Sequence, residues 1–226
     1  MSRLPKTRKT SRVRDKWKQK QWIVVQSPKS FRNTPIAYIP ITDSEEILGR
    51  VVETTLYELM KQDMQDQTKK MLFTVHSING EKASSMLKGY EYSREYLRSL
   101  IRRGSSMISS VGDYVTTDGF KVRVHTLALS QGRIKSSKKH AVRLITSKIL
   151  QEKSNSLTYD QFSQEAVLGK IASDIYNGTK RITQMRHVGI KKMKLIEEGK
   201  AADIEIGENT ETTEDEETIL EPGVAS

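Results

Sequence analysis

The stretch MISSVGDYVTTDGFKVRVHTLAL, residues 107–129, decides the fold class of this chain. Asp118-Gly119 separates two runs that are rich in β-forming residues, and this dipeptide favours a tight type I′ turn between antiparallel strands. After the turn, Phe120, Val122 and Val124 alternate with charged residues and a histidine. One face of this strand is therefore expected in a core and the other in solvent. The stretch predicts a β-hairpin in an antiparallel sheet.

Further strands are predicted on both sides of this hairpin. Residues 71–78 and 83–92 flank Asn79-Gly80, another pair that favours a type I′ turn. Residues 22–25 and 36–39 are rich in β-formers. Residues 188–195 predict a final strand, although Met193 breaks the strict alternation. Residues 51–60 stay ambiguous, because their β-branched content favours a strand while their length permits a helix.

Several segments predict helices. A capping-box spacing at residues 42–45 predicts a short helix that ends before Gly49. Residues 93–103 predict a helix with Gly104 just after its end, and residues 136–154 predict a longer one. A capping box at residues 158–161 opens a helix that is expected to continue to Asn177, before Gly178. Together these elements predict an α+β fold with a barrel-like antiparallel core and flanking helices.

The charge is distributed unevenly along the chain, whose net charge is +10. Residues 1–20 contain nine bases and one acid, whereas residues 203–226 contain nine acids and no base. Neither end has the apolar periodicity of a packed element, so both are expected to be disordered alone. We therefore expect a basic RNA-binding extension at 1–20, a globular domain at 21–198 with a helical pair at about 136–177, and an acidic tail at 199–226.

Several classes of protein are excluded by composition and motifs. The 226 residues include no cysteine, which excludes disulfides and thiol catalysis. No apolar run approaches the roughly 20 residues of a membrane span, and no secretory signal, lipidation motif or basic amphipathic helix is present. Phosphate-binding and nucleophile motifs are absent, and the four histidines are not closely spaced. We expect a soluble intracellular protein that binds no cofactor, metal or membrane and is not an enzyme.

Three basic clusters carry the functional prediction. The first surrounds Trp17, an aromatic ring that could stack on a base, and the others lie at the helix near residue 98 and at the start of the helix near residue 136. The residues predicted to contact RNA are Arg8, Lys9, Arg12, Arg14, Lys16, Trp17, Lys18, Lys20, Arg98, Arg102, Arg103, Arg133, Lys135, Lys138, Lys139 and Arg143. Solvated surface charge is the plain alternative. Three clusters of one sign favour neutralisation of RNA phosphates with release of counterions.

Four segments resemble one protein family. They are VRDKWK at 13–18, LGRVVETTLY at 48–57, RSLIRRGSS at 98–106 and VLGKIASDIYN at 167–177. In this order they are similar to the archaeal and eukaryotic small-subunit ribosomal protein family called S-three-a-e, or e-S-one. The resemblance spans about residues 12 to 196, and the acidic tail is not part of it. The chain is shorter than eukaryotic members, which points to an archaeal source.

The resemblance implies a structural constituent of the small ribosomal subunit, bound to ribosomes in the cytoplasm. The implied position is the platform, near the 3′ end of the small-subunit RNA and the messenger exit. The implied partners are small-subunit ribosomal RNA, neighbouring ribosomal proteins of the platform and messenger RNA near the exit. The implied core is β-rich and barrel-like with flanking helices, and the family offers no catalytic residue to transfer.

Two other functions remain open from the residues alone. A free RNA-binding regulator or chaperone would use the same basic surface and would form a large soluble pool on messenger RNA. A nucleic-acid enzyme would need a carboxylate or histidine cluster assembled by the fold. The acidic tail could also fold back on the basic body and shield it from unrelated RNA, in which case deletion of residues 203–226 should raise such binding.

Overall fold

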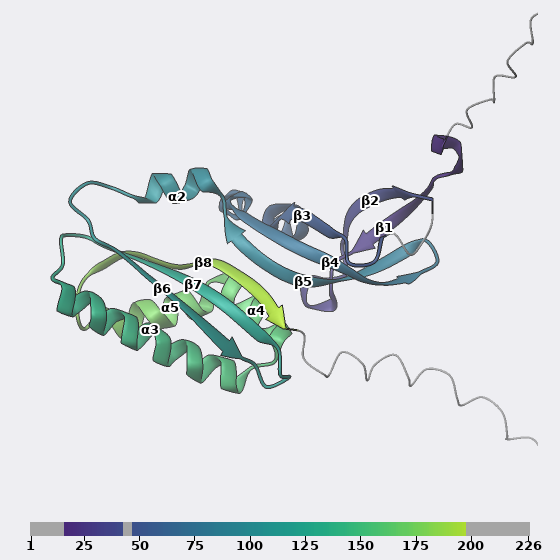
Figure 1. Cartoon of the computed structure of the whole chain (residues 1–226). Helices are drawn as coiled ribbons and strands as arrows, with labels where there is room; N and C mark the ends of the chain where they lie inside the picture. Colours follow the sequence, from purple (N-terminus) through teal and green to yellow (C-terminus); the bar gives the residue numbers. More distant parts are fainter. Residues whose placement is uncertain (1–15, 43–46, 198–226) are drawn as a thin grey trace, which may run out of the picture.

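The computed structural model describes residues 16–42 and 47–197 (Figure 1). The extension before residue 16 and the tail after residue 197 therefore lie outside the described residues. So does most of the short helix that was predicted to begin at Thr42. Within the described parts, eight strands form one sheet and the α-helices are gathered mainly around its second half.

The first part of the chain forms strands and short helices. Its strands are β1 Gln21–Gln26, β2 Pro35–Ile41, β3 Val51–Thr55, β4 Lys69–Asn79 and β5 Lys82–Tyr92. Its short helices are η1 Lys16–Gln19, η2 Lys29–Phe31, α1 Leu56–Met60 and η4 Met64–Thr68. The predicted strands at 22–25, 36–39, 71–78 and 83–92 are confirmed.

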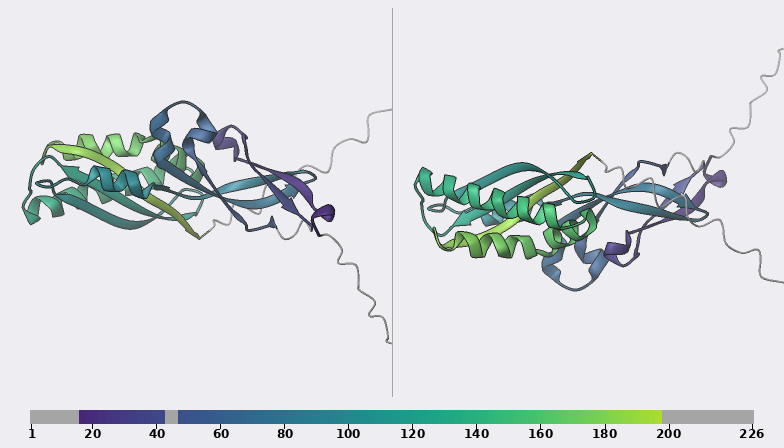
Figure 2. Two further views of the ribbon diagram at one scale, coloured as in Figure 1. Left: turned by 90° about the horizontal axis from the view of Figure 1, so that it is seen from above. Right: turned by 90° about the horizontal axis from the view of Figure 1, so that it is seen from below.

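The second part of the chain supplies the longer helices. Its helices are α2 Arg94–Leu100, α3 Ser136–Ser156, α4 Tyr159–Leu168 and α5 Lys170–Thr179, and its strands are β6 Met107–Val115, β7 Lys121–Ser130 and β8 Met185–Glu197. The two views in Figure 2 show α2 over one face of the sheet and α3 to α5 over the other. The described residues contain no helix that is long and apolar enough to cross a membrane.

Strand β5 joins the two parts of the sheet. Along one edge it pairs with β4, which in turn pairs with β3. Along its other edge, residues 82–84 pair in parallel with β1, whereas residues 89–91 pair antiparallel with β8. The sheet therefore forks at β5 into a β1–β2 branch and a β8–β7–β6 branch, which diverge in Figure 1.

The barrel-like closure that we expected is not seen among the described strands. The mixed helix and strand content agrees with the prediction, but the sheet is open, because β2, β3 and β6 each pair with a single neighbour. A barrel needs every strand to have two partners around a ring. Here one edge of β5 is divided between β1 and β8, so the two branches separate instead of meeting.

The main hydrophobic core lies between the sheet and helices α3 to α5. Phe120, Val122 and Val124 are buried there, as the alternation predicted, together with Phe162 and Ile171 from the helices. The Tyr159 ring stacks on Phe120 with a centroid separation of 5.0 Å, and its hydroxyl donates to the Leu87 carbonyl. These contacts fix α4 against the point where the sheet forks.

The ambiguous segment 51–60 forms both elements. Strand β3 ends at Thr55, whose side chain accepts from the Glu58 amide, while the Glu58 carboxylate accepts from the Thr55 amide. This capping box starts α1 inside a segment that is otherwise rich in β-branched residues. The spacing of Thr55 and Glu58 was the sequence signal for this change of structure.

Both hairpin turns differ from the predicted type I′ turn. In the first, Asn79 pairs with Lys82, so the turn is centred on Gly80-Glu81, and of its residues only Gly80 has a positive φ, at 61°. In the second, Val115 pairs with Lys121, which leaves a longer loop in which Gly119 has φ 80°. A type I′ turn needs positive φ at both central residues. In both turns the predicted glycine has a positive φ, but neither turn is of type I′.

Two predicted helices end earlier than expected. The helix predicted at 93–103 stops at Leu100, with Ile101 in an extended conformation, so Gly104 belongs to the following loop. The helix predicted at 158–177 is interrupted by Gly169, whose φ of 88° is left-handed. Gly178 lies inside α5, where an added Cβ would sit 3.0 Å from Ile149. The glycine there allows α5 to approach α3 closely.

The final strand is confirmed and is longer than predicted. A register shift between His125 and Thr126 makes Lys191 an extra residue opposite β7. This β-bulge lets Met193 be buried although it breaks the simple alternation.

Candidate nucleic-acid interface

The first predicted cluster is described only at its end. Arg8, Lys9, Arg12 and Arg14 lie outside the described residues, and of Lys16 only the backbone is described. Trp17 and Lys18 are exposed, and Lys20 Nζ lies 4.3 Å from the centroid of the Trp17 ring. This cation–π contact places an ammonium group over one face of the indole.

The second cluster lies on α2 and in the loop that follows it. Arg98, Arg102 and Arg103 are all exposed. Helix α2 buries none of its residues, and contacts of Tyr96 and Leu100 hold it in place. The Tyr96 ring packs edge-on against Tyr92 and His187, and the Arg186 guanidinium donates to the carbonyl of Leu100. Arg98 therefore lies on a surface helix, whereas Arg102 and Arg103 follow the end of the helix that Arg186 holds in place.

The third cluster begins in the loop before α3. Arg133, Lys135 and Lys138 are exposed, and Lys139 is half-buried. No side chain caps the N-terminus of α3, so its first amide groups add donors to this positive region. Arg143 differs from the others, because its Nε donates to the Ser109 carbonyl at 3.1 Å. That bond covers an unpaired carbonyl of the edge strand β6.

Buried serines bring the second and third clusters together. The Ser106 amide donates to Ser130 Oγ at 3.0 Å, and the Ser130 amide donates to the Ser106 carbonyl at 3.1 Å. The Ile134 amide donates to Ser106 Oγ at 3.1 Å. Because Ser130 is fully buried, these bonds are shielded from water and fix the α2–β6 loop beside the β7–α3 loop.

A third loop joins them and was missed by sequence reasoning. The Gln131 amide donates to the Gln184 carbonyl at 3.2 Å, and Ile134 and Ile182 pack on the same small core. The α5–β8 turn therefore lies at the same end of the molecule and adds exposed Lys180 and Arg181. We call this region the cationic end: Arg102, Arg103, Arg133, Lys135, Lys180 and Arg181.

The charge of the cationic end is not balanced by nearby acids in the sequence. Residues 96–112, 119–151 and 175–196 contain no aspartate or glutamate. These acid-free segments include all three loops, and they were the signal that could have added Lys180 and Arg181. Two of the acids that border these segments form ion pairs with bases outside the cationic end. Asp113 pairs with Arg123 at 2.6 Å, and Asp174 pairs with Lys153 at 3.0 Å.

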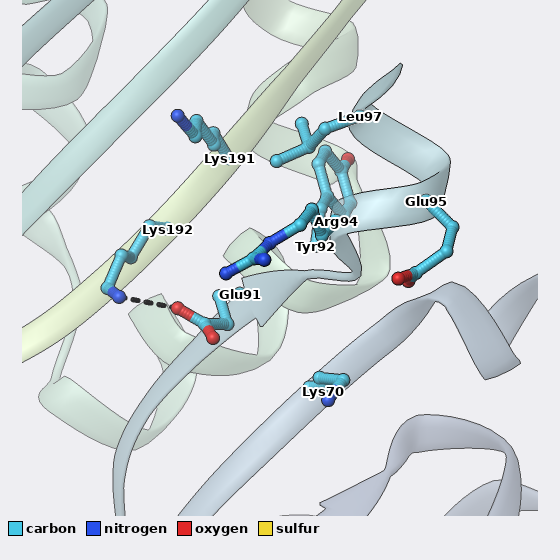
Figure 3. A pocket seen from close by; sticks show the side chains of 8 residues that line it. All are labelled: Lys70, Glu91, Tyr92, Arg94, Glu95, Leu97, Lys191 and Lys192. Atoms are coloured by element: carbon cyan, nitrogen blue, oxygen red, sulfur yellow. Dashed lines mark hydrogen bonds and ion pairs between the residues drawn. The ribbon is translucent and has the colours of Figure 1, made fainter. Parts of the chain in front are cut away.

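A second group of charges surrounds a pocket that is lined by α2 and by strands β4, β5 and β8 (Figure 3). The pocket has a volume of about 620 Å³ and is lined by Lys70, Glu91, Tyr92, Arg94, Glu95, Leu97, Lys191 and Lys192. Figure 3 shows Lys192 reaching Glu91, an ion pair of 2.5 Å, and Lys70 pairs with Glu53 at 2.6 Å. Burial lowers the pKa of His125, and the pocket residues Lys192 and Lys191 lower it further. Two of the four cations of this pocket are paired with acids, so this pocket suits a polyanion less than the cationic end.

The described residues contain no group of three or more histidines, aspartates and glutamates that could hold a metal ion. The arrangement described above is a positively charged surface. Cations on three rigidly joined loops, with a helix N-terminus beside them, can bind phosphate groups and hold an RNA in register.

Known proteins resemble this chain along most of its length. The sequence pattern of the Ribosomal S3Ae family matches residues 8–199. A protein of Archaeoglobus fulgidus named small ribosomal subunit protein eS1 is 39% identical over 196 residues, covering 86% of this chain and 93% of the relative. Proteins of the same name are 39% identical in Saccharolobus islandicus strain L.S.2.15 and 38% identical in Saccharolobus solfataricus, each over 184 residues, 81% of this chain and 88% of the relative. The four segments quoted above were therefore interpreted correctly, and the chain belongs to the Ribosomal S3Ae family.

Proposed function

We propose that this protein is a structural, RNA-binding constituent of the small ribosomal subunit. The observation that carries the proposal is the cationic end, where three loops gather arginines and lysines without acids in their segments. The names of the relatives support the same role, and membership of a ribosomal protein family bears out the expectation of a protein that is not an enzyme.

The mechanism is neutralisation of phosphates on a folded ribosomal RNA. Each lysine or arginine that meets a phosphate releases counterions, so affinity falls steeply as salt is raised. The buried Ser106–Ser130 bonds and the bond from the Gln131 amide to the Gln184 carbonyl keep the three loops in one arrangement, which reduces the ordering needed on binding. The basic extension at 1–20 adds cations that wrap a further part of the RNA.

The finer location follows the family resemblance. We place the protein on the platform of the small subunit, in the cytoplasm, near the 3′ end of the RNA and the messenger exit. Neighbouring platform proteins and messenger RNA near the exit are its proposed further partners. Crosslinking within assembled subunits tests this placement, and crosslinks confined to RNA far from the 3′ end would contradict it.

The proposed RNA contact is tested by removing cations from the cationic end. A variant with Arg102, Arg103, Lys180 and Arg181 changed to glutamine should bind small-subunit RNA more weakly. The slope of log affinity against log salt should become shallower by about one for each cation that contacts phosphate. The matched control changes four cations elsewhere to glutamine, namely Arg50, Lys88, Lys148 and Lys170.

Equal losses in both variants would show that only total charge matters and would overturn the proposed surface. The ribosomal role has a separate test, which is co-sedimentation of the protein with small subunits at physiological salt. A protein that remained in a soluble pool on messenger RNA, while other ribosomal proteins stayed on the subunit, would favour the free regulator instead.

A further inference from the structure

The β1–β2 branch presents an uncharged aromatic surface at the opposite end of the molecule from the cationic end (Figure 1). Trp22 on β1 and Tyr38 on β2 are 59% and 65% exposed. Large aromatic rings are usually buried in a soluble protein, so two exposed rings on adjacent strands need an explanation.

The strand register puts both rings on one face. Trp22 lies opposite Pro40, and Val24 lies opposite Tyr38. Because side chains alternate along a strand, Trp22, Val24, Tyr38 and Pro40 share the face that points away from the small core. The intervening residues, including Ile23 and Ile41, are buried on the other face. Trp22 and Tyr38 are thus diagonal neighbours, about 7–8 Å apart.

The Trp22 and Tyr38 rings form no ring pair with another aromatic residue of the described part of the protein. Such pairs form elsewhere, for example Phe31–Phe73 and Phe120–Tyr159. Strands β1 and β2 contain no charged residue. Helices α3 to α5 do not extend over these strands (Figure 1).

Cations border this aromatic face. Lys18 and Lys20 directly precede β1, and Lys82 of β5 lies opposite Val24 on the same face. Glu81, an exposed acid, directly precedes Lys82, and its backbone carbonyl accepts from the Val24 amide at 2.9 Å. A partner that suits this face has flat apolar rings and negative charge together. Single-stranded RNA has both, because every base offers a π face and every linkage a phosphate.

We propose that Trp22 and Tyr38 form a stacking platform for unpaired nucleotides of RNA, with Lys18, Lys20 and Lys82 meeting the flanking phosphates. This inference rests on the proposed RNA-binding function and assigns different parts of the RNA to two surfaces of the protein. The cationic end holds folded RNA through phosphates, whereas the β1–β2 branch holds a single-stranded segment through its bases. A base-paired helix keeps its bases stacked inside and cannot use the platform.

The two tryptophans of the chain allow a direct test. In full-length protein carrying Trp17→Phe, Trp22 is the sole tryptophan. Titration with short oligouridylate should quench its fluorescence, whereas a mixed-sequence RNA duplex should bind without quenching. In the complementary Trp22→Phe protein, the oligouridylate should change the Trp17 emission less.

Affinity measurements complete the test. Trp22→Ala and Tyr38→Ala should each weaken oligouridylate binding about 5- to 100-fold and leave duplex binding unchanged. Trp22→Phe and Tyr38→Phe should retain most of the affinity, because the ring remains. Tyr57→Ala, at an exposed aromatic on α1, is the matched control and should change neither. Circular dichroism checks that each variant is folded.

Unchanged oligouridylate affinity in both folded alanine variants would overturn the platform. So would a shift of Trp22 emission with protein concentration in the absence of RNA, which would assign this face to contacts between copies. Loss of duplex binding in the cationic-end variant with Trp22 quenching intact would separate the two surfaces. Failure of duplex binding in the unaltered protein would instead count against the proposed function.

Discussion

The helix-covered branch and the β1–β2 branch of one sheet are stabilised very differently. Among the described residues, the main core, which α3 to α5 cover and which also includes residues of η2, α1 and β4, contains twenty buried residues. The core behind β1 and β2 contains six. Buried apolar area is the main source of stability. The helix-covered branch is therefore expected to be the stable unit, and the β1–β2 branch to open locally at lower free energy.

This difference matches the two proposed surfaces. The cationic end lies on the helix-covered branch, where hydrogen bonds of buried serines fix its loops. The aromatic platform lies on the β1–β2 branch, which has the smaller core and one face that no helix covers. A rigid array of cations suits a folded RNA with fixed phosphate positions, while an open sheet face suits a strand that must lie flat on it.

The largest expected effect comes from equal truncations in the two cores. Ile171→Ala, beneath the sheet in α5, should lower the free energy of unfolding by about 4 kcal/mol, near the upper part of the range for such changes. Ile23→Ala in β1 should lower it by about 2 kcal/mol, because the small core can relax more easily. Urea unfolding measures both. Equal losses, or a larger one for Ile23→Ala, would contradict the comparison.

The joint between the branches is the next target. A Cβ at Gly89 would lie 2.3 Å from the backbone carbonyl oxygen of Met193, which cannot move without breaking the β5–β8 pairing. Gly89→Ala should destabilise the protein by about 1–3 kcal/mol. It should also raise amide hydrogen exchange along residues 192–194 more than in β1. Gly132→Ala is the control, since a Cβ there meets nothing within 4 Å.

The buried serine bonds give a smaller and more local effect. Ser130→Ala removes the acceptor of the buried Ser106 amide, a loss of about 1–3 kcal/mol. The α2–β6 and β7–α3 loops would then be held only by the remaining Ser130 amide and Ile134 amide bonds to Ser106. Because they would be less firmly fixed, binding to folded RNA should weaken while quenching of Trp22 by oligouridylate persists. Ser156→Ala, at an exposed position of α3, serves as control. If Ser130→Ala left duplex affinity unchanged, the fixed loops would not matter for binding.

The smallest effect concerns pH. Burial lowers the pKa of His125 and His187 from the ordinary 6.5, and neighbouring cations add to this, Lys192 beside His125 and Arg186 beside His187. The unfolded chain then binds protons more readily, so stability should fall as pH drops from 7 towards 5. His125→Gln should flatten this dependence of the melting temperature, and His140→Gln should not. A stability that rose on acidification would reverse the sign.

Local features of the fold could be predicted from the sequence. The alternation at Phe120, Val122 and Val124 correctly gave the buried face of β7, because a strand exposes alternate residues whatever its partners are. The break at Gly169 could not be predicted, because the apolar stripe continues on both sides of it and an isolated glycine is compatible with a helix. Closure of the sheet was predicted wrongly, since it depends on which edges meet.

The candidate site was predicted only in its parts. The arginines and lysines of the second and third clusters were found from their density in the sequence. Lys180 and Arg181 were not, because two adjacent cations in a turn are common on any surface. Trp22 and Tyr38 were assigned to strands, but they are sixteen positions apart in the sequence. Only the register of β1 against β2 shows that they share an exposed face.

By itself the sequence determined the strands, the hairpins, the uneven charge and the family, because each depends on residues close together or on a pattern of residue types. Only the tertiary structure decided that β5 divides one edge between β1 and β8, and that three separate loops form one cationic end. These outcomes depend on pairing between strands and loops far apart in the chain. The period of two along a strand fixes which side chains are buried, but it does not choose the neighbouring strand.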